Sequence, residues 1–478
     1  MTVFAGAMET LRRVQPLRVT GRVAALRGLT VLVDDLPLPV GSLVSIGGGP
    51  ESGRAADETV GSESRPPRGT FGEIVGFTRE HAIVMPLGQT VGIRVRDRVV
   101  GEQSAQTIGV SSALLGRVID GLGRPIDGLG PVPDSTPRPI NPEPTRALDR
   151  RAINQAMHTG VRALDLFITL GRGQRIGIFS GPGVGKSTLL GTIARRASSD
   201  ANVIALIGER GREVRDFIEN ALGPEGLRRS VVVVATGDES PLLRVRAALA
   251  ACTIAEFFRD EGRDALLMMD SVTRFAHAQR QIGLSVGEPP ATKGYTPSVF
   301  AGLSRMLERA GAVNRGRAGS ITGLYTILVE GDDLSEPVSD AARGILDGHV
   351  ILSRKLAQRS HYPAVDVLDS ISRVAEDVSD RAHVAARRQI VRLMAVYRDV
   401  EDLVQIGAYA RGSNPEADVA IEFRPRIEEL LRQDRGDAAP FEQTRDVLVK
   451  LALQAGDQLQ RRLRDKGPRD RAPPGGTG

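Results

Sequence analysis

The stretch GPGVGKST, residues Gly181–Thr188, combines the residue types that hold phosphate. Glycines let backbone N–H groups converge on phosphate oxygens, and a helix N-terminus adds positive potential. In such a loop, Lys186 would reach the β- and γ-phosphates of a nucleotide, and the Ser187 hydroxyl would bind Mg²⁺. Ser180 stands where the usual GxxxxGK[ST] pattern has its first glycine, but serine is small enough to fit. The candidate phosphate-binding residues are Gly181, Pro182, Gly183, Val184, Gly185, Lys186, Ser187 and Thr188.

A phosphate loop of this kind also needs acidic groups for the metal and for water. The stretch DALLMMD predicts an apolar strand that ends in Asp270, a candidate ligand for Mg²⁺ through water. The stretch VIALIGER predicts another strand, followed by Glu209 and Arg210. Parallel sheets place ligands at the carboxyl ends of their strands, so Glu209, Asp270 and the loop should share one edge. Glu209 is then a candidate for the group that orients and polarises the attacking water.

The elements that must position these residues form a recognisable order along the chain. Short β-rich runs with turn residues predict a small β-barrel over residues 17–103, interrupted by a polar loop around 49–69. Residues 104–376 contain apolar runs that alternate with helical patterns, which predicts an α/β P-loop domain with a parallel sheet. The expected strands are RIGIFS, NVIALIG, SVVVVATG, DALLMMD and SITGLYTILV. Within this domain, the Gly- and Pro-rich residues 116–144 are expected to be a linker.

The two ends of the chain carry different signals. Residues 377–463 have helical periodicity and predict a helical C-terminal domain, and residues 464–478 have the composition of a disordered tail. In residues 1–16, Phe4, Met8 and Leu11 fall on one helical face, which is compatible with a helix docked on the core or with one that binds a partner. We find neither a secretory signal nor an apolar run long enough for a membrane span, and therefore expect a cytoplasmic protein.

The composition argues against nucleic-acid binding. Aromatic residues make up 4% of the chain, there is no Trp, and the net charge of +5 is spread over 478 residues. Base-stacking proteins depend on aromatic side chains and a basic surface. The single cysteine, Cys252, allows no disulfide within the chain and is expected to be a buried apolar residue.

Three long stretches resemble one family when they are taken together. These are GPGVGKST, IGERGREV, and the segment from Met269 to Gly311, and GDDLSEPVSDAARGILDGHVILSR extends the match. They are similar to the catalytic subunits of rotary ATPases and to bacterial type III export ATPases. The residues of GEPPATKGYTPSVF and of the GDDLSEP stretch are most similar to those of the export branch, above all to its flagellar members. The resemblance implies a RecA-like P-loop core between an N-terminal barrel and a C-terminal helical domain.

The resemblance also implies roles that the residues alone do not suggest. Arg210 and Arg274 match family arginines near the γ-phosphate. Tyr362, in HYPAVD, matches the aromatic residue that packs on adenine. Arg373, in DSISRV, matches the arginine finger that a subunit donates across an interface to its neighbour.

The expected function is Mg²⁺-dependent ATP hydrolysis by a ring of six identical subunits that energises export of flagellar proteins. The expected partners are a stator-like regulatory protein, a central stalk protein, export substrates and their chaperones, with peripheral attachment to the inner face of the cell membrane. The ATPase of a non-flagellar type III injectisome is one alternative, and the catalytic subunit of a proton-translocating ATP synthase is another. A ring-shaped RNA translocase is disfavoured, because Phe71 and Phe77 are the only aromatic residues in the barrel region 17–100.

Overall fold

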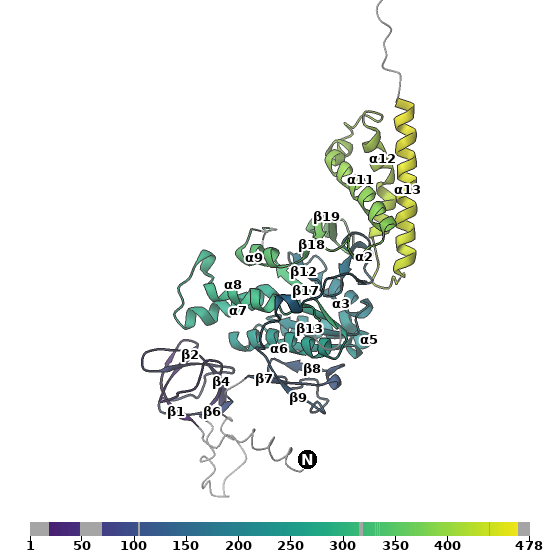
Figure 1. The fold of residues 1–478 in the computed structure, drawn as a ribbon. Helices are drawn as coiled ribbons and strands as arrows, with labels where there is room; N and C mark the ends of the chain where they lie inside the picture. The colour runs from purple at the N-terminus through teal and green to yellow at the C-terminus, as the bar shows by residue number, and fades with distance from the viewer. Residues whose placement is uncertain are drawn as a thin grey trace, which may run out of the picture.

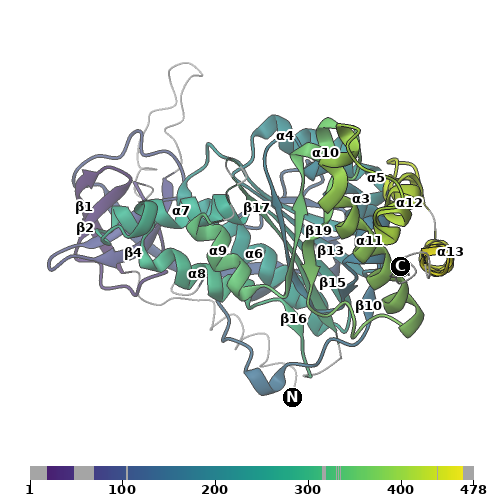
Figure 2. The same ribbon diagram turned by 90° about the horizontal axis from the view of Figure 1, so that it is seen from above.

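The computed structural model describes residues 19–47, 69–103, 106–314, 319–329, 331, 333, 335–438 and 440–466. The expected N-terminal helix, the polar loop up to residue 68 and the tail beyond residue 466 lie outside these ranges. Figures 1 and 2 show a small barrel at one end, a helix-covered sheet in the middle and long C-terminal helices at the other end. The expected fold class, an α/β P-loop core with a β-barrel and a helical C-terminal region, is confirmed.

The N-terminal barrel is closed, with its strands in the order β1-β2-β5-β4-β3-β6. Its interior holds alternate, mostly β-branched side chains such as Val23, Val33, Ile74 and Val84, because successive residues of a strand point to opposite faces. The strands are β1 (Thr20–Arg27), β2 (Thr30–Asp34), β3 (Leu43–Ile46), β4 (Thr70–Phe77), β5 (Ala82–Pro86) and β6 (Arg98–Gln103).

The central sheet contains nine strands within the described ranges, in the order β19-β18-β12-β17-β15-β13-β14-β8, with β16 beside β17. The five expected strands are neighbours in it, and all of their pairings are parallel. They are β12 (Arg175–Ser180), β13 (Ala201–Ile207), β14 (Ser230–Ala235), β15 (Asp264–Asp270) and β17 (Ser320–Leu328). The remaining strands are β8 (Val118–Asp120), β16 (Gly311–Ala312), β18 (Gly348–Leu352) and the antiparallel edge strand β19 (Val365–Ser372).

Helices cover both faces of this sheet, and each face has its own hydrophobic cluster. One face is covered by α6 (Pro241–Asp260), α7 (Val272–Ser285), α8 (Pro297–Leu307) and α9 (Pro337–Ile345). The other face is covered by α2 (Arg162–Phe167), α3 (Lys186–Arg196), α4 (Gly211–Asp216), the π-helical turn η4 (Phe217–Leu222) and α5 (Gly223–Arg228). Cys252, in the middle of α6, is buried as expected.

The C-terminal region is a bundle of α11 (Arg381–Gln405), α12 (Pro415–Leu431) and α13 (Phe441–Lys466). Its apolar side chains belong to the same cluster as α2 and α3, so the bundle packs on the face that carries the phosphate loop. No helix of the described ranges is both long and apolar enough to cross a membrane. The shorter elements are β7 (Thr107–Val110), η2 (Ser112–Leu114), β9 (Thr136–Pro139), η3 (Ala147–Asp149), β10 (Ala156–Met157), β11 (Leu170–Gly171), η5 (Thr292–Gly294) and α10 (Arg354–Gln358).

The expectation of a linker over residues 116–144 is wrong for two short segments, because β8 and β9 both lie within this range. Val118–Asp120 forms β8, which pairs in parallel with β14 as the outer strand of the central sheet. The following turn is held by Asp127, which accepts hydrogen bonds from the Arg117 guanidinium at 2.7 and 2.9 Å and from the Val118 backbone at 3.0 Å. The strand was missed because it spans three residues between glycines, so its turn signals outweigh its apolar signal.

Candidate functional site

The phosphate loop lies between the end of β12 and the start of α3, as its sequence predicts. Gly183 and Gly185 adopt the left-handed backbone conformation, with φ of 76° and 91°, which favours glycine. Gly185 is the N-cap of α3, and Lys186 is the first residue of the helix. Ser187, in the first turn, is exposed, so its hydroxyl is open to a ligand.

Three charged side chains meet beside this loop. The Lys186 ammonium donates to Asp270 Oδ1 and lies 3.7 Å from Glu209 Oε1. Asp270 ends β15, and Glu209 comes two residues after the end of the neighbouring strand β13. The structure therefore brings together the lysine and both carboxylates that the strand order predicted at one edge.

The Asp270 carboxylate is buried, with 4% of the residue exposed, and is held from the adjacent strand. Thr326, on β17, donates from its hydroxyl to Asp270 Oδ1 at 2.7 Å. This second donor fixes the carboxylate together with Lys186, and the sequence analysis did not identify it. The strand SITGLYTIL contains Ser320 and Thr322 as well as Thr326, so its sequence alone did not single out Thr326.

The environment of Glu209 changes its acid strength. Burial is the largest cause, and the nearby Asp270 charge adds to it, while Lys186 acts in the opposite direction. Together they raise the pKa of Glu209 from 4.5 to about 7. A carboxyl group with a pKa near the working pH is suited to accept and return a proton.

The residues present fit a divalent cation shared with a nucleotide. A serine hydroxyl and a carboxylate are hard oxygen ligands of the kind that Mg²⁺ uses together with substrate phosphates. Among the described residues, no group of three or more His, Cys, Asp or Glu side chains could hold a metal alone. Ser187 and Asp270 could therefore hold a metal only together with phosphate oxygens, because they do not form a complete protein cage.

A cavity of about 350 Å³ adjoins the loop on the side away from β15. The Tyr362 ring, which is 45% exposed, forms one wall and lies against Gly185, where an added Cβ would be 3.4 Å from a ring carbon. The aromatic ring and the size of the cavity suit a nucleotide base. Tyr362 thus lies beside the loop, and its packing on adenine stays a prediction.

The C-terminal region supplies another wall that the sequence analysis missed. Gln433, Asp434 and Arg435, between α12 and α13, line the cavity. The Gln433 backbone N–H donates to the Tyr362 carbonyl at 2.9 Å, and the Arg435 guanidinium donates to Thr188 Oγ1 at 3.0 Å. Because 247 positions separate Arg435 from Thr188, no local pattern could have placed them together.

The three candidate arginines occupy different places. Arg274 is exposed and packs on Gly208, where an added Cβ would lie 2.8 Å from Arg274 Cβ, so it is close to Glu209. The Arg210 side chain is 86% exposed and lies 3.8 Å from Glu213, so within this chain it is not drawn into the cluster.

Arg373 lies at the other end of the sheet. Ser372 pairs with Gly348 at the start of β18, whereas Leu352 at its end pairs with Ser180, just before the phosphate loop. The rise from Gly348 to Leu352 alone is roughly 13 Å at ~3.3 Å per residue. The exposed Arg373 side chain therefore cannot take part in the phosphate site of its own chain.

Two family models match most of the chain. One is described as the ATP synthase alpha/beta family, nucleotide-binding domain, and matches residues 160–372. The other is described as the T3SS EscN ATPase C-terminal domain and matches residues 379–450. The two matches cover the central sheet except β8, the phosphate loop and most of the C-terminal helices.

Individual proteins are similar over nearly the whole chain. The flagellum-specific ATP synthase of Treponema pallidum (strain Nichols) is 49% identical over 93% of this chain and 95% of its own length. The type 3 secretion system ATPase of Xanthomonas euvesicatoria is 50% identical over 79% of this chain and 85% of its own. The solved structure of the assembled ATPase EscN from enteropathogenic E. coli has a TM-score of 0.81 at 40% identity, covering 90% of this chain and all of that one. A structure of EscN with its central stalk EscO has a TM-score of 0.80 at 39% identity.

Proposed function

The chain belongs to the ATP synthase alpha/beta family and is an ATPase, and we propose that six copies form a ring that energises export of flagellar proteins. The observation that carries the ring is the position of Arg373. Each chain assembles Lys186, Glu209 and Asp270 at one edge of its sheet and exposes Arg373 at the other. A closed ring of identical chains brings these two edges together at every interface.

The residues at one interface would divide the chemistry of hydrolysis among them. The loop and Lys186 bind the β- and γ-phosphates, and Ser187 and Asp270 hold Mg²⁺, which neutralises phosphate charge when bound. Glu209 orients the attacking water and accepts its proton, which its raised pKa permits. Arg274, which packs on Gly208 close to Glu209, and the exposed Arg210 would approach the γ-phosphate. The neighbour's Arg373 stabilises the charge that develops in the transition state.

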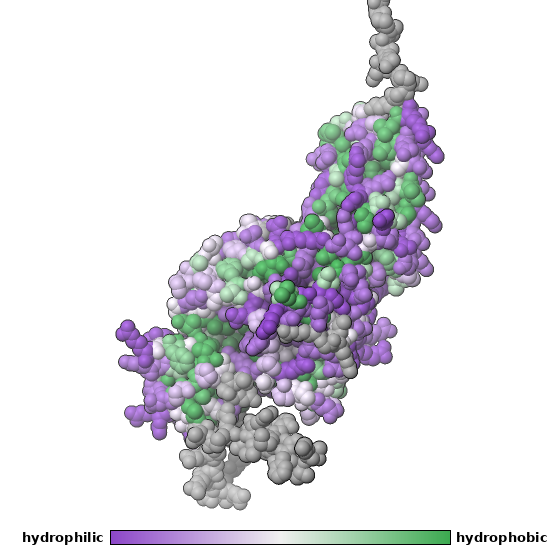
Figure 3. All heavy atoms as spheres, viewed as in Figure 1, coloured by the Kyte–Doolittle hydropathy of each residue, from purple (hydrophilic) through white to green (hydrophobic). Residues whose placement is uncertain are grey.

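The base would occupy the cavity beside Tyr362, with the C-terminal segment around Gln433 and Arg435 as its outer wall. Since that segment joins α12 to α13, nucleotide binding acts directly on the C-terminal helices. These helices carry exposed large apolar side chains such as Leu403, Leu453 and Leu463, and Figure 3 shows apolar surface over this part of the molecule. This surface suits the partners that we propose: a central stalk protein, export substrates and their chaperones.

The flagellar assignment rests on the relatives. The flagellum-specific protein of Treponema pallidum is 49% identical over 93% of the chain, whereas EscN, which covers a similar 90% of the chain, is 40% identical. We further propose that a stator-like regulatory protein binds residues 1–16 and holds the ring at the inner face of the cell membrane. The ATPase of an injectisome is the second candidate, because relatives of that type also match closely.

Deletion of the gene, followed by complementation, tests the proposed function. The wild-type gene should restore flagellar filaments and swimming, and Lys186→Ala should not. Lys450→Ala, which changes an exposed lysine on α13, is the matched control and should restore both. If the deletion strain swims normally but loses secretion through an injectisome, the protein would instead be the ATPase of that injectisome.

A further inference from the structure

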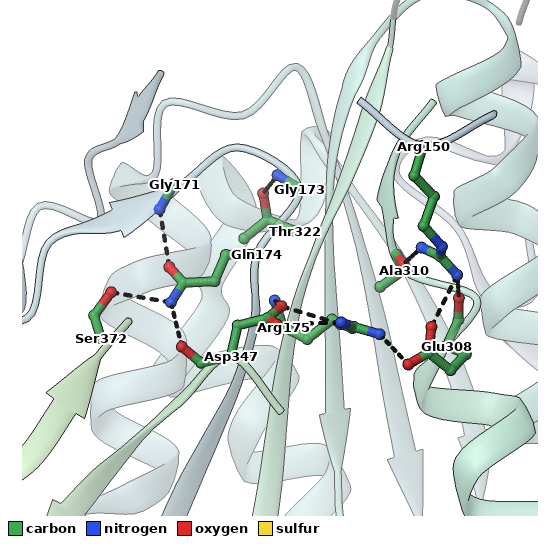
Figure 4. Close-up of polar contacts among 10 residues, drawn as sticks. All are labelled: Arg150, Gly171, Gly173, Gln174, Arg175, Glu308, Ala310, Thr322, Asp347 and Ser372. Atoms are coloured by element: carbon green, nitrogen blue, oxygen red, sulfur yellow. Dashed lines mark hydrogen bonds and ion pairs between the residues drawn. The ribbon is translucent and has the colours of Figure 1, made fainter. Parts of the chain in front are cut away.

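The residue just before β12, Gln174, is a completely buried amide that joins three segments. Its Oε1 accepts from the Gly171 backbone N–H at 2.9 Å. Its Nε2 donates to the Asp347 carbonyl at 3.1 Å and to Ser372 Oγ at 3.0 Å, as Figure 4 shows. Both hydrogens of the amide nitrogen are therefore used, one on the side chain of Ser372, which precedes Arg373, and one on the Asp347 carbonyl just before β18.

The two groups that Gln174 binds hold the backbone of Arg373 on both sides. The Asp347 carbonyl also accepts from the Arg373 backbone N–H at 3.0 Å. Ser372, the preceding residue, donates from Oγ to the Thr169 carbonyl at 2.9 Å. One buried amide thus fixes both the acceptor of the Arg373 N–H and the side chain next to it.

A second set of contacts keeps Asp347 in place. Arg175 binds its carboxylate through the backbone N–H and Nε, both at 3.0 Å, and through Nη2 at 3.1 Å. Arg175 also pairs with Glu308, which Arg150 binds at 2.9 Å from the other side (Figure 4). These charge-assisted bonds attach the Asp347 segment to the start of β12 and to the end of α8.

The backbone of Arg373 is held by buried hydrogen bonds, whereas its guanidinium is exposed, and this difference indicates what the buried bonds do. Gln174 is fully buried, whereas Arg373 is exposed, and its guanidinium makes no hydrogen bond or ion pair with the residues that the structure describes. A group that must meet a reacting phosphate on another molecule needs a rigid base, because small displacements are costly for catalysis.

We propose that Gln174 and Ser372 are positioning residues for Arg373, and that they act on the active site of the neighbouring subunit rather than on their own. This inference rests on the proposed function, in which Arg373 completes a shared site. It predicts that changing Gln174 lowers catalysis at the site of the neighbouring subunit, which receives Arg373. The site of its own chain should stay intact, although Gln174 directly precedes the strand that ends in the phosphate loop of that chain.

Kinetics of Gln174→Met and Ser372→Ala test the first part. Each should lower kcat about ten- to hundred-fold, the scale of a displacement of about 1 Å, and leave the KM for ATP unchanged. The control is Thr322→Val, which removes a buried bond of the same kind, from the Gly173 N–H to Thr322 Oγ1 at 2.9 Å, without touching the Arg373 segment. Wild-type kcat in both test variants, or an equal loss in the control, would overturn the proposal. If Gln174→Met does not fold, Ser372→Ala decides alone.

Mixed rings test where the defect acts. Mixed with Glu209→Gln, each variant should recover activity, because Glu209→Gln subunits donate a properly held Arg373 to intact sites. Mixed with Arg373→Ala, neither should recover, because both partners then lack a working arginine. Rescue of Arg373→Ala by Glu209→Gln without rescue of Gln174→Met and Ser372→Ala would overturn this inference alone. Failure of Arg373→Ala itself to be rescued would overturn the shared site and this inference with it.

Discussion

The shared site can be tested by dividing its two halves between two sets of chains. Arg373→Ala removes the guanidinium that a subunit contributes to the site of its neighbour. Glu209→Gln removes the carboxylate that acts in the site of its own chain. Arg373 lies beside the start of β18, and the phosphate loop follows the end of β12, so one chain cannot bring them together. Loss of an arginine finger lowers the rate roughly 10³–10⁵-fold, which corresponds to about 4–7 kcal/mol in the barrier. Each variant alone should therefore bind ATP and turn it over very slowly.

Mixing the two variants should restore a predictable fraction of the activity. In rings assembled at random from equal amounts, about one interface in four pairs an intact Glu209 with a neighbour's intact Arg373. Those interfaces are chemically wild type. Activity per chain should then rise to about a quarter of the wild-type value, which is far above the sum of the two parent variants.

The assay is steady-state ATP hydrolysis, with native mass spectrometry to show that the rings contain both variants. The control pairs Glu209→Gln with Arg461→Ala, which changes an exposed arginine on α13 and should show simple dilution of active sites. If mixed rings are present and their activity stays at the level of the parents, Arg373 does not act between subunits and the reasoning from the two edges of the sheet is refuted.

Four further predictions follow from the same structure. Lys186→Ala should abolish turnover and weaken Mg-ATP binding, because the β- and γ-phosphates would lose their ammonium partner; near-normal turnover in a coupled-enzyme assay would contradict its role. Activity per chain should rise with protein concentration until rings are saturated, and a flat profile for a protein that stays monomeric in light scattering would contradict a site completed by a neighbour. Deletion of residues 1–15 should remove the regulatory partner in pull-downs and leave ATP binding intact; unchanged partner binding would leave this segment without the proposed role. Burial raises the pKa of Glu73, on β4 of the barrel, from 4.5 to about 7, so folding favours its protonated form. The free energy of unfolding should therefore fall by roughly 3 kcal/mol as the pH rises from about 4.5 to 7. Glu73→Gln should flatten this pH dependence in urea titrations, and an unchanged slope would exclude Glu73 as its source.

The sequence predicts the parts of the site whose geometry is local. The loop Gly181–Thr188 is contiguous, so its strand, its glycines and its helix can be recognised together. Glu209 and Asp270 were placed correctly because parallel strands present their carboxyl ends at one edge. In each case a few residues and one rule of sheet geometry were sufficient.

The parts that were missed depend on contacts between distant segments. Arg435 reaches Thr188 only because the C-terminal helices pack on α2 and α3, and no pattern near residue 435 indicates a nucleotide. Thr326 supports Asp270 from a strand that is adjacent in the sheet and not in the chain. Gln174 has the same character, because its partners lie 173 and 198 positions away.

These distant contacts give the strand β12 a particular place in the ring that we propose. Its end carries the loop that holds a subunit's own phosphates, and its start is joined through Gln174 and Arg175 to the segment of Arg373. The opposite wall of the same nucleotide cavity is joined through Arg435 to the C-terminal helices. In the proposed ring, a displacement of the loop on nucleotide binding or release would act both on the Arg373 segment and on the C-terminal helices. The ring that we propose would pass the state of one site to its neighbour through β12, and outward to its partners through Arg435 and the C-terminal helices.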